Sequence, residues 1–335
     1  MSLSSSALSS TSTSSPSTST LSNHHCFTPD TTIPCALILL NTTSSSFEAL
    51  DRVWKATNYH ILADGAANHL YRTIVIHSLL ENFKQEKHET TNTSTNTFLT
   101  LSTTNNILSL IPSSLLSIPS PSQLSPSTIS LLKSYLPDCI MGDWDSIQPE
   151  IEIFYKSLGV PMIKDPDQYS TDLMKCLNYI DERSKTSQQL TKVIIYGAFG
   201  GRLDQEMNNL NILYKYTNKF RQVTLLSNDC LACLLPKGIT NIEIAYPYEG
   251  PLCGLIPLGL PVASLTTTGL HWDVTNWSTA INGDSISTSN HIDGYPYSHP
   301  LDESTHNQEK KEIQLPMMVK IETSDPIIWT ASVHM

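Results

Sequence analysis

Apolar runs and amphipathic stretches alternate along residues 34–226, and this alternation predicts strands followed by helices. Buried strands are predicted over residues 34–41, 59–63, 138–141, 193–196 and 223–226. Helices are predicted over 47–55 and 150–158. A third is predicted after Thr171, where apolar residues recur at 173, 177 and 180, and a fourth after Gly201, where they recur at 203, 207 and 210. Alternating strands and helices favour a mostly parallel sheet that is covered on both faces, the arrangement of a three-layer α/β domain.

The pattern changes after residue 236, where helical periodicity ends. Short β-type runs follow at 242–246, 252–257, 262–268, 285–289 and 318–323, separated by glycine and proline. Such spacing is typical of an all-β sandwich or barrel. We therefore expect an α/β domain over 34–236 and a second, all-β domain over 237–335.

Two Ser/Thr-rich segments interrupt this plan. Residues 1–33 hold too few apolar side chains to offset the entropy of ordering, so we expect a disordered tail. Residues 84–130 are also rich in Ser, Thr and Asn, and a structureless loop of that length is rare inside a compact domain. We interpret this segment as an insertion at the surface, with enough Leu and Ile for a short helix.

Charge and cysteine content narrow the classes of function. The formal net charge of −11 disfavours nucleic acid as a partner, while a small anionic substrate can still be held by local Lys, Arg and metal ions. Seven cysteines at irregular spacing suit a reducing compartment, and Cys230 and Cys233 are expected to be buried thiols rather than zinc ligands. Apolar runs stay below the roughly 20 residues that a membrane span needs, and residues 1–33 contain no Lys or Arg, so we expect a cytoplasmic protein without membrane contact.

Two acidic residues follow the strand predicted at 138–141. Asp143 and Asp145 stand at positions i and i+2 of Gly-Asp-Trp-Asp-Ser, so in an extended chain they point to the same side. Carboxylates so close together repel unless a cation separates them, and Mg²⁺ is held by one or two carboxylates together with substrate phosphates. A solvated turn explains the same spacing equally well, so the motif alone leaves both interpretations open.

A second cluster surrounds the start of the helix predicted after Thr171. Asp172 lies in its first turn, near the positive end of the helix dipole, and Lys175 follows one turn later. An ordinary N-terminal acid with a surface lysine is the favoured interpretation of this pair alone. A functional role is favoured instead if the pair lies beside a magnesium site. We expect this because ligands of an open α/β sheet bind outside the carboxyl ends of its strands.

Two more clusters end predicted strands. Gly200 and Gly201 stand between a strand and a helix, where main-chain N–H groups can approach phosphate, and Arg202 can bind two phosphate oxygens at once. A tight turn that needs glycine accounts for this pattern equally well. Asp64 closes the strand at 59–63, with Asn68 four residues on, and a helix cap is the simple alternative.

One tryptophan stands out in the all-β domain. Trp272 follows Thr-Thr-Thr-Gly-Leu-His and can stack on a flat or cationic ring. Taken alone, it is better explained as a core residue.

Together the clusters resemble the thiamine pyrophosphokinase family, of the fungal type. Six family motifs occur in order: Ala-Asp-Gly-Ala-Ala-Asn at 63–68, Gly-Asp-Trp-Asp-Ser-Ile at 142–147, Asp-Gln-Tyr-Ser-Thr-Asp at 167–172, Gly-Gly-Arg-Leu-Asp-Gln at 200–205, Thr-Thr-Thr-Gly-Leu at 266–270 and Ser-Thr-Ser-Asn at 287–290. The resemblance covers about 34–80 and 133–334. It implies an α/β nucleotide-binding domain, a C-terminal β-sandwich, and a homodimer with active sites between subunits.

The resemblance also assigns roles to individual residues. It implies that Mg²⁺ is held by Asp143, Asp145 and Asp172, with Asp64 beside them as a fourth catalytic acid. It assigns ATP contacts to Asn68, Gln168, Thr171, Lys175, Gly200, Gly201, Arg202 and Asp204. It assigns the thiamine pocket to Trp272, Ser289 and Asn290. Two departures weaken the match: Ala66 replaces a common glycine, and the stretch between Trp272 and Ser287 differs from the family pattern.

The expected reaction is transfer of a pyrophosphoryl group from ATP to the hydroxyl of thiamine, which gives thiamine diphosphate and AMP. Such transfers depend mainly on positioning and charge neutralisation. Either Asp145 or Asp172 is a candidate to accept the hydroxyl proton. The alternatives are a related phosphotransferase with another acceptor and a non-catalytic sensor of thiamine or nucleotide.

Overall fold

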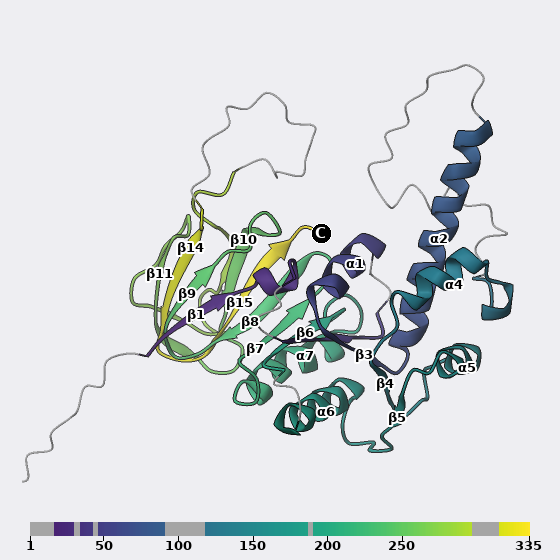
Figure 1. Ribbon diagram of the computed structural model, residues 1–335. Coiled ribbons are helices and arrows are strands. Elements are labelled where there is room, and N and C mark those ends of the chain that lie inside the picture. The colour runs from purple at the N-terminus through teal and green to yellow at the C-terminus, as the bar shows by residue number, and fades with distance from the viewer. Residues whose placement is uncertain (1–16, 30–33, 43–45, 91–117, 187–189, 297–314) are drawn as a thin grey trace, which may run out of the picture.

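The computed structural model describes residues 17–29, 34–42, 46–90, 118–186, 190–296 and 315–335. Two β-sheets organise these residues, and helices cover one part of the larger sheet (Figure 1). The larger sheet has ten strands in the order β13-β10-β15-β8-β7-β6-β2-β3-β4-β5, and the smaller has five in the order β1-β9-β14-β11-β12. The predicted α/β region and the predicted all-β region are both present.

Six neighbouring strands form the parallel part of the larger sheet: β2 (Cys35–Leu39), β3 (Tyr59–Ala63), β4 (Cys139–Gly142), β5 (Met162–Lys164), β6 (Lys192–Tyr196) and β7 (Gln222–Leu226). The α-helices are α1 (Phe47–Ala56), α2 (Ala66–Thr90), α4 (Pro126–Lys133), α5 (Pro149–Ser157), α6 (Asp172–Thr186) and α7 (Leu203–Tyr216), with short 3₁₀ turns η1 (His24–Cys26) and η3 (Pro121–Gln123).

Helices cover both faces of this parallel part, which confirms the three-layer prediction. In β2, Leu37 and Leu39 pack into the core that contains α1 and α2, whereas Ala36 and Ile38 pack into the core that contains α6 and α7. A strand that is buried on both faces reads as a continuous apolar run, and that is why sequence pattern located it. The predicted stripe on α6 is also correct, because its members at 173, 177 and 180 are all buried.

The apolar stripe predicted for α7 is wrong at two of its three positions. Leu203 is 70% exposed and Met207 is 41% exposed, while Ile212, Leu213 and Tyr216 make the buried face. Leu210, the third member of the predicted stripe, is partly buried against the core, so the prediction fails only in the first turns of the helix. An apolar patch therefore remains at the surface near the glycine-rich loop.

The second half of the chain supplies antiparallel strands to both sheets: β8 (Cys230–Leu235), β9 (Gly238–Glu243), β10 (Glu249–Ile256), β11 (Val262–Thr268), β12 (Trp277–Thr279), β13 (Ser287–His291), β14 (Met318–Thr323) and β15 (Ile327–Val333). Apolar residues of β8, β10 and β15 share one core with those of β9, β11 and β14. This packing forms the expected β-sandwich.

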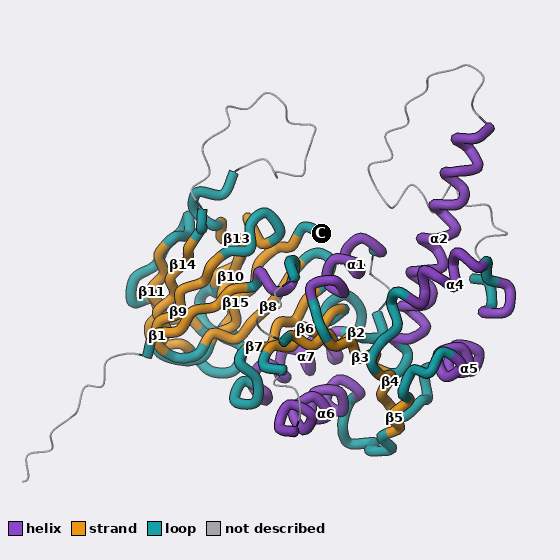
Figure 2. The backbone as a smooth tube through the Cα atoms, in the orientation of Figure 1, coloured by secondary structure: helices purple, strands orange, loops and turns teal. Residues whose placement is uncertain are grey.

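One sheet of the sandwich is continuous with the α/β sheet. β8 pairs antiparallel with β7 on one side and with β15 on the other, so hydrogen bonding crosses the predicted boundary at 236/237 without a break. Figure 2 shows the strands following one another from β13 and β10 through to β5. The two predicted domains are thus two ends of one sheet, because a change of periodicity in the sequence does not mark the end of a sheet.

The prediction of disorder up to residue 33 is wrong for the described residues 17–29. β1 (Thr18–Ser22) pairs in parallel with β9, and Asn23 behind it is fully buried. Its side chain donates to Glu249 Oε1 (3.0 Å) and accepts from Gln222 Nε2 (2.8 Å). A Ser/Thr-rich segment can form an edge strand because main-chain hydrogen bonds and one buried polar network hold it. Residues 1–16 and 30–33 lie outside the described residues.

The predicted insertion at 84–130 begins too early and ends too late. α2 continues to Thr90, and α4 starts at Pro126 behind the cap formed by Ser125. The helix expected within this segment corresponds to α4, whose Leu132 is buried. Residues 91–117 lie outside the described residues. Across the described part of the chain, we find no helix with the length and apolar character that a membrane crossing requires.

Candidate active site

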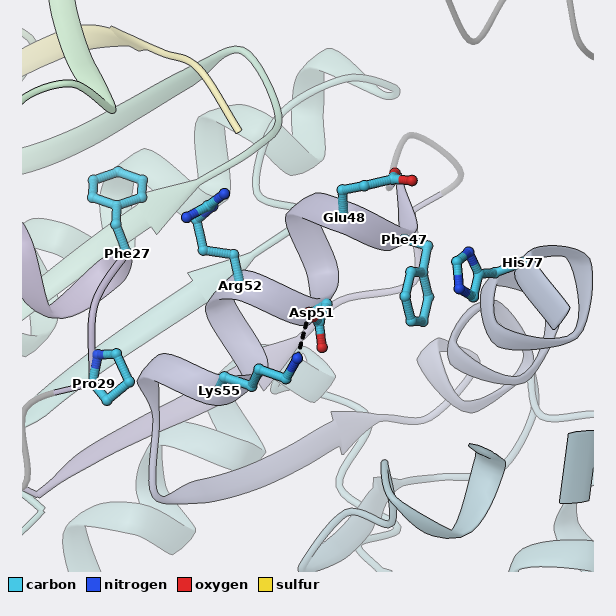
Figure 3. Close-up of a pocket in the computed structure, with 8 residues that line it drawn as sticks. All are labelled: Phe27, Pro29, Phe47, Glu48, Asp51, Arg52, Lys55 and His77. Carbon is cyan, nitrogen blue, oxygen red and sulfur yellow. Dashed lines mark hydrogen bonds and ion pairs between the residues drawn. The ribbon is translucent and has the colours of Figure 1, made fainter. Parts of the chain in front are cut away.

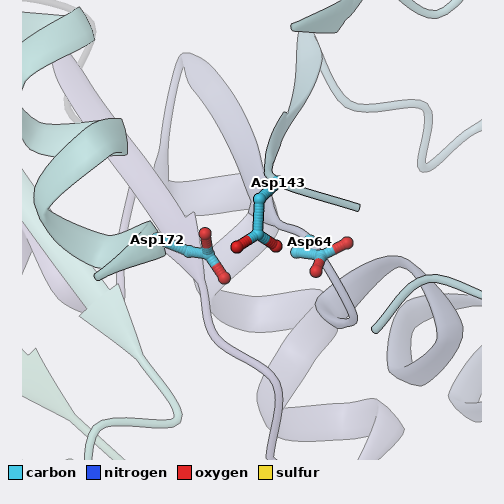
Figure 4. Close-up of side chains that lie close together, drawn as sticks. All are labelled: Asp64, Asp143 and Asp172. Atoms are coloured by element: carbon cyan, nitrogen blue, oxygen red, sulfur yellow. The ribbon is translucent and has the colours of Figure 1, made fainter. Parts of the chain in front are cut away.

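Three aspartates from separate elements meet at the carboxyl edge of the parallel strands. Asp64 follows β3, Asp143 follows β4, and Asp172 begins α6. One carboxylate oxygen from each lies within 4.8 Å of the others (Figure 4). β3 and β4 are neighbours in the sheet, so their ends bring the first two acids together, and α6 contributes the third.

Close approach of these strand ends depends on Gly142. A Cβ atom at this position would lie 2.6 Å from Asp64 Cβ and 3.3 Å from Asp172 Oδ1. Asp64 itself adopts the left-handed region, with φ of 39°, and is 1% exposed. Ala66 opens α2 as a buried helical residue outside the left-handed region, so the departure from the family glycine carries no strain of that kind.

Asp64 also holds the loop that carries the next acids. Its Oδ2 accepts from Ser146 N (3.0 Å), and its Oδ1 accepts from Ile147 N (3.2 Å). Burial raises the pKa of Asp64 to about 6, against the opposing effect of the Ser146 hydrogen bond and with the help of the negative charge of Asp172. The carboxylate therefore sits where a nearby cation would relieve an electrostatic cost.

A buried lysine balances part of this charge. Lys175 is 2% exposed, and its Nζ lies 3.2 Å from Asp172 Oδ1 and 3.8 Å from Asp143 Oδ2. Burial lowers the pKa of Lys175, but the two carboxylates outweigh that effect and raise it overall. Burial also raises the pKa of Asp172, with Lys175 opposing the change. The lysine is thus charged and points at the acids.

The acids that gather are not the set expected from sequence. Asp64 belongs to the group whose oxygens lie within 4.8 Å, in place of Asp145. Asp145 is exposed, its main-chain N–H donates to Asp143 Oδ1 (3.3 Å), and its Oδ1 accepts from Ser146 Oγ (2.7 Å). Trp144 between the two acids adopts φ of 71°, so the chain there is not the extended one assumed from sequence. The Asp145 carboxylate nevertheless lies close enough to Asp64 to help raise its pKa, so a role for Asp145 beside the group stays a prediction.

Residues assigned to ATP have varied surroundings. Gln168 Nε2 donates to Asp143 Oδ2 (3.1 Å). Burial raises the pKa of Asp143, but this hydrogen bond, the main-chain N–H of Asp145 and the charge of Lys175 together lower it more. Thr171 Oγ1 accepts from the main-chain N–H of Met174 (3.4 Å) at the start of α6. Asn68 is hydrogen-bonded to the loop at 143–148, at Ser146 O and Gln148 N.

The glycine-rich loop lies two strands from β3 along the same edge. Gly200 and Gly201 have φ of 90° and 148°, and the Gly200 N–H donates to Glu206 Oε1 (2.9 Å). Arg202 and Asp204 are both exposed and form a two-point ion pair, with Nε 3.0 Å from Oδ1. The loop is accessible, and its charged side chains are paired with each other.

The loops after four strands form one continuous surface. A Cβ at Gly197, after β6, would lie 2.2 Å from Thr42 Cγ2, after β2, and a Cβ at Gly65, after β3, would lie 2.5 Å from Asn41 Nδ2. Gly142 at the end of β4 lies similarly close to Asp64, which follows β3. Acids, lysine and glycine loop thus share one side of the sheet, as the rule for open α/β sheets predicts.

The residues assigned to thiamine lie together on the sandwich. The Trp272 side chain is 60% exposed, so its interpretation as a core residue is wrong. Asn290 is 5% exposed and bridges the Trp272 main chain: its Oδ1 accepts from Trp272 N (3.1 Å), and its Nδ2 donates to Trp272 O (3.0 Å). Ser289 is exposed and adopts φ of 57°.

Sequence reasoning missed Asp273, which builds the turn that carries Trp272. Its carboxylate accepts from Thr267 Oγ1 (2.7 Å), Gly269 N (3.1 Å) and Leu270 N (3.2 Å). An acid four residues after Gly269 is a signal that could have located it, because the N–H groups of such a turn need an acceptor.

A cavity of about 470 Å³ beside α1 lies apart from these residues. Phe27, Phe47, Arg52 and His77 are among the side chains that line it, and Asp51 and Lys55 pair across one helical turn within it at 2.7 Å (Figure 3). None of the residues predicted for the site lines this cavity. The acids at the strand ends therefore remain the best-supported centre for chemistry.

Carboxylates that can hold a divalent cation, a buried lysine and an accessible glycine loop are characteristic of enzymes that transfer phosphoryl groups from nucleotides. Comparison with known proteins narrows this class. The family model described as "Thiamin pyrophosphokinase, catalytic domain" matches residues 50–225, and "Thiamin pyrophosphokinase, vitamin B1 binding domain" matches residues 240–296. The chain belongs to the thiamine pyrophosphokinase family.

Relatives and solved structures agree with this assignment. Thiamine pyrophosphokinase 1 of Oryza sativa subsp. japonica is 45% identical over 48% of this chain and 60% of its own length. Thiamine pyrophosphokinase 3 of the same organism is 40% identical over 60% of this chain and 68% of its own length. The chain thus spans 60–68% of these two relatives. The crystal structure of yeast thiamin pyrophosphokinase shares the fold, with a TM-score of 0.64 and 22% identity over 94% of this chain and 91% of that one.

Proposed function

We propose that the protein transfers a pyrophosphoryl group from ATP to the hydroxyl of thiamine and releases thiamine diphosphate and AMP. The observation that carries this proposal is the meeting of Asp64, Asp143 and Asp172 beside buried Lys175 in a chain of this family. In this reaction the thiamine oxygen bonds to the β-phosphorus of ATP while the bond from that phosphorus to the α-phosphate oxygen breaks.

The donor set fits a magnesium ion. Oxygen ligands from carboxylates are those that Mg²⁺ prefers, and the three acids offer one each. We propose Asp64, Asp143 and Asp172 as the residues that hold it, in place of the set with Asp145. When bound, the ion would neutralise charge on the phosphate oxygens.

The remaining residues of the site have separable roles. Lys175 places a positive charge within 4 Å of two of the acids, where a phosphate held at the same centre gains electrostatic stabilisation. The N–H groups of the glycine loop and the start of α7 favour a phosphate further along the edge. Asp145 lies next to the three acids but outside their group, so we propose it as the acceptor of the hydroxyl proton.

Trp272 is the proposed platform for thiamine, but it lies far from the acids within one protomer. Asn290, which holds Trp272, is on β13, and Asp143 follows β4, eight strand positions away in the same sheet. At about 4.8 Å per strand this amounts to roughly 38 Å along the sheet. We therefore propose that the site is completed by Trp272 of a second copy in a homodimer. The exposed Leu203 and Met207 beside the glycine loop provide apolar surface for such an interface.

Product analysis tests the reaction. The purified protein is incubated with thiamine, ATP and MgCl₂, with and without EDTA, and both products are separated by chromatography. Equal amounts of thiamine diphosphate and AMP, abolished by EDTA, support the proposal. ADP or free pyrophosphate would indicate another phosphotransferase, and thiamine binding without turnover would indicate a sensor.

Complementation tests the shared site. Asp143→Ala removes an acid and Trp272→Ala removes the ring, so each variant alone should have little activity when thiamine is kept well below the wild-type KM. If each site combines the two subunits, unfolding and refolding an equimolar mixture should restore about a quarter of the wild-type activity, because half of the dimers are mixed and each has one intact site. A mixture as inactive as its components would reject the shared site.

A further inference from the structure

Asn68 occupies a special place beside the acids. It lies in the first turn of α2, half-buried, and its side chain faces the loop that joins Asp143 to α5. Its Nδ2 donates to Ser146 O (2.9 Å), and its Oδ1 accepts from Gln148 N (3.0 Å). The amide thus bridges the main chain of the acidic loop at two points, two residues apart.

Asp64 completes a set of side-chain anchors for this loop. It accepts from the N–H groups of Ser146 and Ile147. Together, Asp64 before α2 and Asn68 in its first turn hold four main-chain groups over residues 146–148. The two anchors differ in one respect. Asp64 must share its carboxylate with any cation bound at the centre, whereas neutral Asn68 has no such competing partner.

The amide of Asn68 is matched to its two partners. Turning the side chain over would set its NH₂ group against the Gln148 N–H and its oxygen against the Ser146 carbonyl, which places like against like at both ends. An aspartate could accept from Gln148 but could not donate to Ser146. These two hydrogen bonds therefore fix the orientation of the amide, and each end keeps one further donor or acceptor, so kinetics must separate positioning from nucleotide contact.

We infer that Asn68 is a positioning residue: it holds the 143–148 loop so that Asp143 meets Asp64 and Asp172, rather than binding ATP. This inference rests on the proposed function for its place in catalysis, but its physical content is the arrangement of the acids. Partners that orient metal ligands typically affect metal affinity or activity by about 10–100-fold when they are removed.

The test measures cation binding in the absence of nucleotide and thiamine. Terbium(III) is the probe, because Trp144 lies between Asp143 and Asp145 and can sensitise its luminescence. The Trp144→Phe variant identifies the part of the signal that arises at this loop. We expect Asn68→Ala to bind terbium about 10–100-fold more weakly than the wild type.

The matched control is Asn218→Ala. Asn218 is exposed in the turn after α7, on the amino side of β7 and therefore at the opposite edge of the sheet from the acids. Its replacement should leave terbium affinity unchanged. If Asn68→Ala does not fold, as judged by circular dichroism and thermal unfolding, Asn68→Ser supplies the second variant. Its side chain is neutral and too short to bridge Ser146 and Gln148, so terbium binding should again weaken, and wild-type terbium affinity would overturn the inference.

Kinetics separate positioning from nucleotide contact. A positioning role predicts that Asn68→Ala lowers kcat and raises the magnesium concentration needed for half-maximal rate, with the KM for ATP nearly unchanged at saturating magnesium. Wild-type terbium affinity combined with a raised KM for ATP would overturn the inference. A wild-type protein without turnover would reject the proposed function instead, and the terbium titration would still decide the role of Asn68.

Discussion

Replacing Gly142 by alanine places a methyl group directly inside the group of acids. The new Cβ would lie 2.6 Å from Asp64 Cβ, 3.2 Å from Asp64 Cγ and 3.3 Å from Asp172 Oδ1. The first of these distances is about 1 Å shorter than a normal contact between two carbon atoms. Asp64 is buried and hydrogen-bonded to two main-chain N–H groups, so it cannot move aside without breaking them.

The strain must therefore separate the ends of β3 and β4. Overpacking of this kind costs about 1–3 kcal/mol of folding stability, and each kcal/mol lowers the melting temperature of a large domain by about 2–4 °C. The effect on turnover should be larger than the effect on stability. A displacement of about 1 Å in a reacting arrangement can reduce the rate roughly 100-fold, and here it separates Asp64 from Asp143 and Asp172.

Thermal unfolding and steady-state turnover measure the two effects on the same preparation. Gly283→Ala is the matched control, because its Cβ would lie no closer than 3.3 Å to another atom, at Ala280 O, in a turn without positive φ. We expect Gly142→Ala to melt several degrees lower and to lose about two orders of magnitude in kcat, with the control close to wild type. Wild-type turnover in Gly142→Ala would refute the claim that close contact of these strand ends creates the site.

Three further changes test the electrostatics and the thiamine platform. Lys175→Met removes a positive charge beside Asp143 and Asp172. Terbium should then bind more tightly in the absence of nucleotide, while kcat falls about 100-fold or more. Weaker terbium binding would contradict the proposed electrostatic role of Lys175. In metal-free protein, Asp64 has a pKa of about 6, above its value in the unfolded chain, so its stabilising contribution is complete below about pH 4 and is lost as the pH rises through 6. The melting temperature in EDTA should fall over that range, and Asp64→Asn should flatten the slope. Trp272→Ala should raise the KM for thiamine about tenfold with little change in melting temperature, because the ring is 60% exposed; an unchanged KM would remove it from the pocket.

Much of the α/β part could be predicted because its strands are buried on both faces. β3 has the bounds that its apolar run predicts, and β2, β4, β6 and β7 differ from theirs by one or two residues. The convergence of Asp64, Asp143 and Asp172 also follows from the sequence once the strands are known to be parallel neighbours. Their exact grouping does not follow, because it depends on the left-handed conformations of Asp64 and Trp144, which residue type alone does not specify.

The N-terminal segment shows a second limit of sequence pattern. β1 has no apolar run to report it, and its order comes from pairing with β9 and from buried partners that lie more than 190 residues away along the chain. Glu249 is the centre of that network: it is fully buried and accepts from Asn23, from Trp329 Nε1 (3.1 Å) and from Ala245 N (3.1 Å). Composition measures what a segment can bury by itself, so it overlooks a segment whose polar groups complete a distant core.

The order of motifs in the sequence carries no information about distance, and here that matters for mechanism. The motifs between residues 63 and 205 converge because they end neighbouring parallel strands of one sheet. The motif at 287–290 lies on β13 at the other end of the same sheet, held there by the unbroken hydrogen bonding through β8, β15 and β10. The motif at 266–270 starts on β11 of the smaller sheet, and Asn290 ties the Trp272 main chain behind it to β13. A flexible boundary between two domains could have allowed them to close on each other, but a continuous sheet does not. The length of this sheet is therefore the structural argument for our proposal that the two halves of the site come from different copies of the chain.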